Sequence, residues 1–198
     1  MRPLKITLIV LAGLACGAGL IFAYNAATRN TVTDIPGVVS ATPGLSFNDA
    51  VGIPDRLIIP KIGVDAHVKA VGVDANGDMA TPGNATDAAW YKPGPRPGMP
   101  GSAVIDGHLN TKYVPQAVFY NLKQLQPGDE VQVRTAEGQT VVFKVAKVQN
   151  FAENAPTGEI FNAQGAVPRL NLISCAGDWD PVRKIYNERI VVFTERVK

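Results

Sequence analysis

Two side chains that could form a nucleophile and a general base lie far apart in the sequence, at Cys175 and His108. Cys175 ends the apolar run of residues 170–175, which is typical of a β-strand. Residues 176–181 are loop formers, so we expect the thiol to lie at a strand end, where a substrate can reach it. His108 follows a second apolar run, residues 103–105, through Asp-Gly. A lone cysteine and a distant histidine form a candidate catalytic pair.

Other polar residues near these runs leave alternatives open. The second histidine, His67, lies in an apolar run between Ala66 and Val68, and we expect it to have no catalytic role. Asp106 and Asn110 flank His108 and either orient its ring or only form hydrogen bonds at the surface. Cys175 taken alone is also compatible with a buried structural cysteine, which needs no partner.

The composition limits the classes of function that the chain can have. With 198 residues, 46% hydrophobic residues and a formal net charge of +2, it can form one domain with an appendage and is not basic enough to suggest nucleic-acid binding. The cysteines are Cys16 and Cys175, so an exported domain would contain one thiol and no internal disulfide. One cysteine and two histidines without short spacing cannot supply a set of metal ligands. We therefore expect no metal and no cofactor.

The N-terminal segment has the length and charge pattern of a membrane anchor. Residues 6–24 contain no charged side chain, and as a helix they would extend about 28 Å, close to the thickness of a bilayer core. Arg2 and Lys5 precede them, which places the N-terminus in the cytoplasm and the rest of the chain outside. The alternatives are a signal peptide cleaved within residues 23–27 and, from the faint lipobox pattern of residues 13–16, lipidation.

The remaining chain divides into a linker and one domain. Residues 25–50 read as a flexible extracellular linker, whereas residues 51–198 form a domain of short apolar runs broken by turn formers. This pattern predicts an all-β barrel or sandwich, with at most a helical turn at residues 121–125. The expected strands lie at residues 56–60, 66–71, 101–105, 130–134, 140–145, 170–175 and 189–193.

Four segments, in this order, resemble the sortases, the membrane-anchored cysteine transpeptidases of Gram-positive cell surfaces. They are residues 56–66, 90–98, 104–108 and 170–175. The chain looks most like the actinobacterial class E and F enzymes, and the segment at 90–98 favours class F. The resemblance implies an eight-stranded β-barrel that recognises an LPXTG-like sorting signal of secreted proteins. It also implies cleavage between Thr and Gly and transfer to an amine of a peptidoglycan precursor or a pilin.

The resemblance also implies roles for individual residues. Cys175 would attack the substrate carbonyl as a thiolate, while His108 would protonate the departing amine and later deprotonate the incoming one. An arginine would hold the peptide and stabilise the oxyanion. The candidates are Arg189, which we expect to open the final strand, and Arg183, in the preceding loop. We choose Arg189 because a strand holds a donor more rigidly than a loop.

The chain departs from the family pattern before the cysteine, and two other readings compete with it. Threonine is expected at the positions of Asn171 and Ser174; Ser174 keeps the hydroxyl, so the departure concerns the pocket beside the thiol. A cysteine L,D-transpeptidase would place a histidine two residues before its cysteine, where this chain has Ile173. The other competing reading is a membrane-anchored binding or structural β-domain without catalysis.

Overall fold

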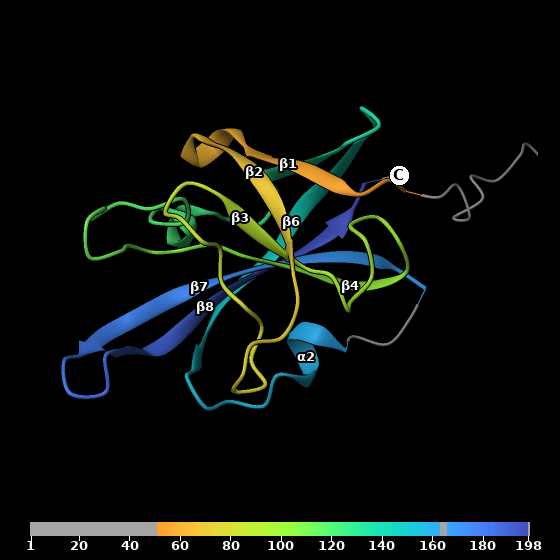
Figure 1. The fold of residues 1–198 in the computed structure, drawn as a ribbon. Coiled ribbons are helices and arrows are strands. Elements are labelled where there is room, and N and C mark those ends of the chain that lie inside the picture. The colour runs from red at the N-terminus through yellow and green to blue at the C-terminus, as the bar shows by residue number, and fades with distance from the viewer. Residues whose placement is uncertain (1–50, 163–165, 198) are drawn as a thin grey trace, which may run out of the picture. The chain divides into compact units, whose positions relative to one another are not determined.

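The computed structural model describes residues 51–162 and 166–197. Within them lie eight strands and three short helices (Figure 1). The strands are β1 (Pro54–Ile59), β2 (Val64–Val71), β3 (Ala88–Tyr91), β4 (Gly101–Asp106), β5 (Glu130–Thr135), β6 (Thr140–Ala152), β7 (Pro168–Asp180) and β8 (Ile185–Arg196). The helices are the 3-10 turns η1 (Pro60–Ile62) and η2 (Leu122–Gln124) and the single-turn α2 (Gly158–Phe161).

The strands form a closed barrel in the order β1-β2-β3-β4-β7-β8-β6-β5. Most neighbouring strands are antiparallel, but β2 pairs with β3 and β4 pairs with β7 in parallel. A parallel pair needs a long connection, and the connection from β4 to β7 contains β5 and β6. The all-β barrel of eight strands is therefore confirmed, and η2 confirms the predicted helical turn.

Strands β3 and β6 differ from the sequence prediction. β3 has only four residues and was not among the expected runs, because so short a segment shows no clear alternation. It is identified only by its pairing with β2 on one side and β4 on the other. β6 continues to Ala152, beyond the predicted end at residue 145, because β8 pairs with it along this extension.

The interior of the barrel is filled by aliphatic and aromatic side chains. In β5, the side chains of Val131 and Val133 point inward, whereas Gln132 between them keeps contact with solvent. Each such side chain contributes about 1.5–3 kcal/mol through its burial. The largest interior side chains that are completely buried include Leu57, Ile59, Ile105, Phe119, Phe143 and Leu172.

A second apolar cluster covers the outer face of β4, β7 and β8. It consists of Val104, Ile160, Val191 and Phe193, with Ile160 contributed by α2. The side-chain amide of Asn171 donates a 2.6 Å hydrogen bond to the carbonyl of Ile160 and ties α2 to β7. Asn171, one of the departures from the family pattern, therefore anchors the segment between β6 and β7.

The predicted membrane anchor of residues 1–24 and the linker of residues 25–50 lie outside the described residues. Among the residues that the structure describes, no helix has both the length and the apolar character needed to cross a membrane.

Candidate active site

Cys175 does not lie at the end of a strand, contrary to the sequence prediction. β7 continues to Asp180 and forms a long hairpin with β8, which Figure 1 shows running beyond the neighbouring strands to a turn. The loop-forming residues after the thiol accommodate a break in register between Ala176 and Trp179, where Gly177 has φ +75°. Cys175 is nevertheless accessible, because β4 pairs with β7 only as far as Ile173.

The pairing of β7 with β8 places Arg189 directly opposite Cys175. Paired residues on adjacent strands point to the same face, and neighbouring residues along a strand point to opposite faces. Ile190 belongs to the barrel interior, so Arg189 and Cys175 lie on the outer face. Both are half-buried. The residues that carry the thiol and the guanidinium are therefore direct cross-strand neighbours on the outer face of the sheet.

Ser174 points inward and connects β7 to the segment that carries His108. Its hydroxyl donates a 2.7 Å hydrogen bond to the carbonyl of Gly107, 67 positions earlier in the chain. The amide of Gly107 donates in turn to the carbonyl of Ile173, at 3.2 Å. A Cβ at position 107 would lie 2.5 Å from the ring of Phe119, so the close approach requires glycine. Asp106 and His108 are thus fixed on either side of a tightly held residue.

The ring of His108 contacts the long connection between β2 and β3. Its Nε2 lies 2.9 Å from the carbonyl oxygen of Pro82, which is buried. A carbonyl can only accept, so Nε2 carries the hydrogen of this bond, and the other ring nitrogen, Nδ1, takes no part in it. Sequence reasoning missed Pro82, because a main-chain acceptor has no signature in the side-chain pattern.

Burial and charge shift the acid–base properties of two groups at the site. Burial raises the pKa of the Cys175 thiol, Arg189 acts in the opposite direction, and Asp106 raises it further. Burial raises the pKa of Asp106 to about 6, against the positive charges of His108 and Arg189 and the Gly107 amide. Asp106, whose role the sequence left open, therefore lies in the same electrostatic environment as Cys175, His108 and Arg189.

The two candidate arginines differ in their surroundings. Arg189 lies within β8, which begins at Ile185, so the expectation that it opens the strand was wrong. Its Nη1 donates to the carbonyls of Tyr186 and Glu188, both at 2.9 Å. These bonds hold the guanidinium of Arg189 against the main chain of β8, the strand that pairs with the Cys175 strand.

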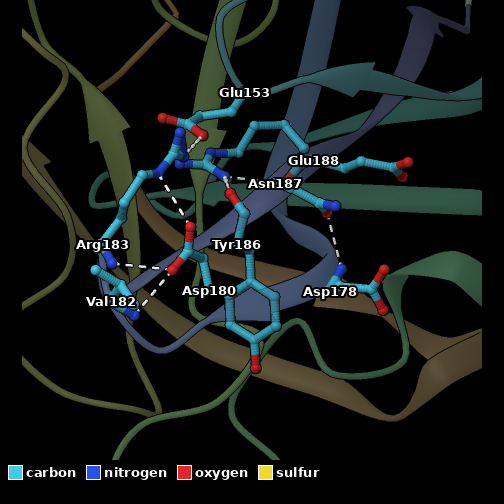
Figure 2. Close-up of polar contacts among 9 residues, drawn as sticks. Glu153, Asp178, Asp180, Val182, Arg183, Tyr186, Asn187 and Glu188 are labelled. Atoms are coloured by element: carbon cyan, nitrogen blue, oxygen red, sulfur yellow. Dashed lines mark hydrogen bonds and ion pairs between the residues drawn. The ribbon is translucent and has the colours of Figure 1, made fainter.

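Arg183 lies in the exposed turn between β7 and β8 and pairs with Glu153 and Asp180, as Figure 2 shows. The carboxylate of Asp180 also accepts from the Arg183 amide at 3.0 Å. Arg183 is therefore engaged in holding the turn.

The remaining candidates, His67 and Asn110, have other neighbours in the structure. His67 is exposed on β2, where it pairs with Arg56 and lies near Asp65. The side-chain amide of Asn110 donates a 2.7 Å hydrogen bond to the hydroxyl of Tyr186, so it holds the His108 segment against the hairpin rather than orienting the imidazole. Among the described residues, no group of three or more His, Cys, Asp or Glu side chains could hold a metal ion.

The comparisons with known proteins agree with this geometry. A family model described as the sortase domain matches residues 57–197. Sortase C-1 from Actinomyces oris is similar in structure, with 23% identity, a TM-score of 0.55 and 76% of each chain covered. A lid mutant of sortase A from Corynebacterium diphtheriae has 17% identity and a TM-score of 0.57, covering 74% of this chain and 70% of that one.

Sortase C from Streptococcus pneumoniae is also similar, with 16% identity, a TM-score of 0.56, and 73% of this chain and 68% of that chain covered. No curated protein matches the sequence significantly. The structural likenesses support the barrel fold, and the family model extends over nearly all of the described residues. The chain therefore belongs to the sortase family and is a cysteine transpeptidase.

Proposed function

We propose that Cys175 is the nucleophile, His108 the general acid and base, and Arg189 the oxyanion donor of a sortase that cleaves an LPXTG-like sorting signal between Thr and Gly. The observation that carries this proposal is the direct pairing of Cys175 with Arg189 on the outer face of the barrel, beside the segment that carries His108. A cysteine transpeptidase needs a thiol, a proton donor and a charge that stabilises the oxyanion, and these three side chains supply them.

The reaction proceeds through two acyl transfers. The thiolate of Cys175 attacks the carbonyl carbon of the threonine, and the negative charge that develops on the oxygen is stabilised by Arg189. The C–N bond then breaks, and His108 donates its proton to the departing glycine amine. An incoming amine from a peptidoglycan precursor or a pilin loses a proton to His108 and attacks the thioester. The new amide forms as the thiolate leaves.

The proposal accounts for the buried setting of the thiol. Burial raises the pKa of Cys175, so only a small fraction of molecules carries the thiolate near neutral pH. We expect a slow enzyme whose resting thiol resists adventitious oxidation.

Incubation with an LPXTG peptide should produce a thioester adduct on Cys175. Intact-mass and peptide-mapping mass spectrometry should detect the acyl fragment that ends in threonine, together with the free glycine-containing fragment. Addition of an amine nucleophile should release the acyl fragment as an amide. A peptide with the threonine and glycine exchanged provides the control. A folded protein that forms no adduct with several sorting-signal variants would contradict the proposed substrate class.

We further propose that residues 1–24 anchor the protein in the membrane, residues 25–50 form an extracellular linker, and residues 51–198 act as the catalytic domain outside the cell. The support is the uncharged run of residues 6–24 with basic residues before it. Such an anchor would hold the enzyme where secreted proteins and wall precursors meet.

Protease added to intact, wall-stripped cells should therefore remove the domain that follows Tyr24 and leave a short membrane-held fragment. Immunoblotting with antibodies against each part should show this result, and a cytoplasmic protein that stays intact provides the control. A protected domain, or release of most of the protein into the medium, would contradict the anchor.

A further inference from the structure

Tyr186 is the second residue of β8 and lies half-buried on the β7–β8 hairpin, three positions before Arg189. The strand register pairs it with Trp179, and the two aromatic rings pack edge to face, with centroids 5.2 Å apart and an interplanar angle of 60°. Trp179 follows Cys175 along β7. The ring of Tyr186 is therefore packed against the strand that carries the proposed nucleophile.

The hydroxyl of Tyr186 connects the hairpin to the segment that carries His108. The side-chain amide of Asn110 donates a 2.7 Å hydrogen bond to the phenolic oxygen of Tyr186, although 76 positions separate the two residues. Asn110 is half-buried and follows His108 across Leu109. Among the hydrogen bonds of the described residues, this one alone joins residues 107–121 to β8.

The main chain of Tyr186 contacts the guanidinium of Arg189. Nη1 of Arg189 donates a 2.9 Å hydrogen bond to the Tyr186 carbonyl. Tyr186 thus contacts the proposed oxyanion donor through its carbonyl, the segment of the proposed general acid through its hydroxyl, and the strand of the proposed nucleophile through its ring. Three segments that are distant in the sequence meet at this one residue.

We propose that Tyr186 is a positioning residue of the transpeptidation, which fixes the segment of His108 relative to Arg189 and Cys175. This inference rests on the roles proposed above for those three side chains. In acylation, Arg189 must stabilise the oxyanion and His108 must protonate the departing amine of the same peptide unit. Both side chains therefore have to be placed correctly at once, and a small displacement of either one lowers the rate.

Two attachments tie the His108 segment to the β7–β8 pair, one on each side of the histidine. Before His108, the carbonyl of Gly107 accepts a 2.7 Å hydrogen bond from the hydroxyl of Ser174. After His108, Asn110 donates to Tyr186. Loss of the second attachment leaves the segment tied to the strand pair on one side only. A neutral hydrogen bond typically favours the held arrangement by roughly threefold to tenfold, so the population of correctly placed His108 should fall by that factor.

Tyr186→Phe tests this role, because it removes the hydroxyl and keeps the ring and the carbonyl. Single-turnover acylation, with enzyme in excess over an LPXTG peptide, should show a saturating rate constant lowered by roughly threefold to tenfold and an unchanged half-saturating enzyme concentration. Asn110→Ala should give the same loss, and the double variant should lose no more than either single one, because both changes break one bond. Tyr113→Phe is the matched control, since it removes the hydroxyl of an exposed tyrosine after His108, and it should keep the wild-type rate.

The NMR spectrum of the imidazole rings provides a measurement that needs no sorting signal. The chain has two histidines, so nitrogen-15-labelled histidine gives signals from His67 and His108, which His67→Ala assigns. In Tyr186→Phe the ring resonances of His108 should shift or broaden, because its segment is held on one side only, whereas those of His67 should stay in place. Absence of an acyl adduct in the wild type would refute the proposed substrate, yet these spectra would still test Tyr186.

Thermal unfolding of each full-length variant separates positioning from stability. A folded Tyr186→Phe with a lower saturating rate and altered His108 resonances would support the positioning role. A rate within twofold of the wild type, additive losses in the double variant, or a loss confined to the half-saturating concentration would overturn it. Resonances of His108 that coincide with those of the wild type would also overturn it. Failure of both Tyr186→Phe and Asn110→Ala to fold would assign the bond to the stability of the barrel and would likewise overturn the proposal.

Discussion

Replacing Cys175 with alanine should abolish both cleavage and transfer, and His108→Ala should reduce them nearly as far. Without the thiol no acyl intermediate can form. Without the imidazole the departing amine lacks a proton donor, which costs roughly 10²–10⁴-fold in rate. The measurement is the release of the glycine-containing fragment from an LPXTG peptide, followed by chromatography, with circular dichroism to verify that each variant is folded.

His67→Ala is the matched control for His108→Ala, because these are the two histidines of the chain. His67 is exposed on β2, away from the β7–β8 pair, so its removal should leave most of the activity. A loss comparable to that of His108→Ala in a folded His67→Ala variant would reverse the assignment. Activity that survives in Cys175→Ala would refute the proposed nucleophile.

Arg189→Ala should lower the rate of acylation by roughly a hundredfold or more, about 3 kcal/mol, as the loss of an oxyanion donor typically does. Arg189 faces Cys175 across the β7–β8 pair, and its contacts with two main-chain carbonyls hold it before the substrate arrives. Arg189→Lys should restore little activity, since an ammonium lacks the planar set of donors. Acylation measured as a single turnover, with enzyme in excess over the peptide and no acceptor amine added, reports the effect without interference from the second step.

Arg183→Ala provides the comparison on the same hairpin. Its ion pairs with Glu153 and Asp180 are exposed, and such pairs contribute about 0–1 kcal/mol to stability. The rate of acylation should therefore stay within a few-fold of the wild type. The opposite ranking of the two arginines would transfer the role to Arg183 and leave Arg189 as a residue that only stabilises β8.

Much of the barrel could be predicted from local patterns. The run of β5 alternates apolar and polar residues, that of β4 contains the apolar stretch of residues 103–105, and turn formers separate such runs. β3 was missed because four residues carry too little pattern, and its position depends on β2 and β4, which it joins. The hairpin extension of β7 was read as a loop because Gly177 lies at a break in register rather than in a turn, and the turn itself begins only at Asp180.

The residue types by themselves identified the pair that we propose for the chemistry. The chain has one cysteine after residue 16, and only one of its histidines follows an apolar run through a glycine, so Cys175 and His108 could be selected without coordinates. The preference for Arg189 over Arg183 also came from the sequence, although on the wrong premise that Arg189 begins the strand. The sequence carries this information because cysteine and histidine are rare in this chain, and Cys175 and His108 each follow an apolar run.

The tertiary structure alone decided how these residues face one another. Strand register sets Arg189 opposite Cys175, and the neighbouring positions of β4 and β7 bring Asp106 beside the thiol although they are far apart in the chain. The carbonyl of Pro82 reaches His108 only because the connection between β2 and β3 folds back over it. Such pairings depend on strand order and on main-chain atoms, which every residue has, so no side-chain pattern in the sequence could show them.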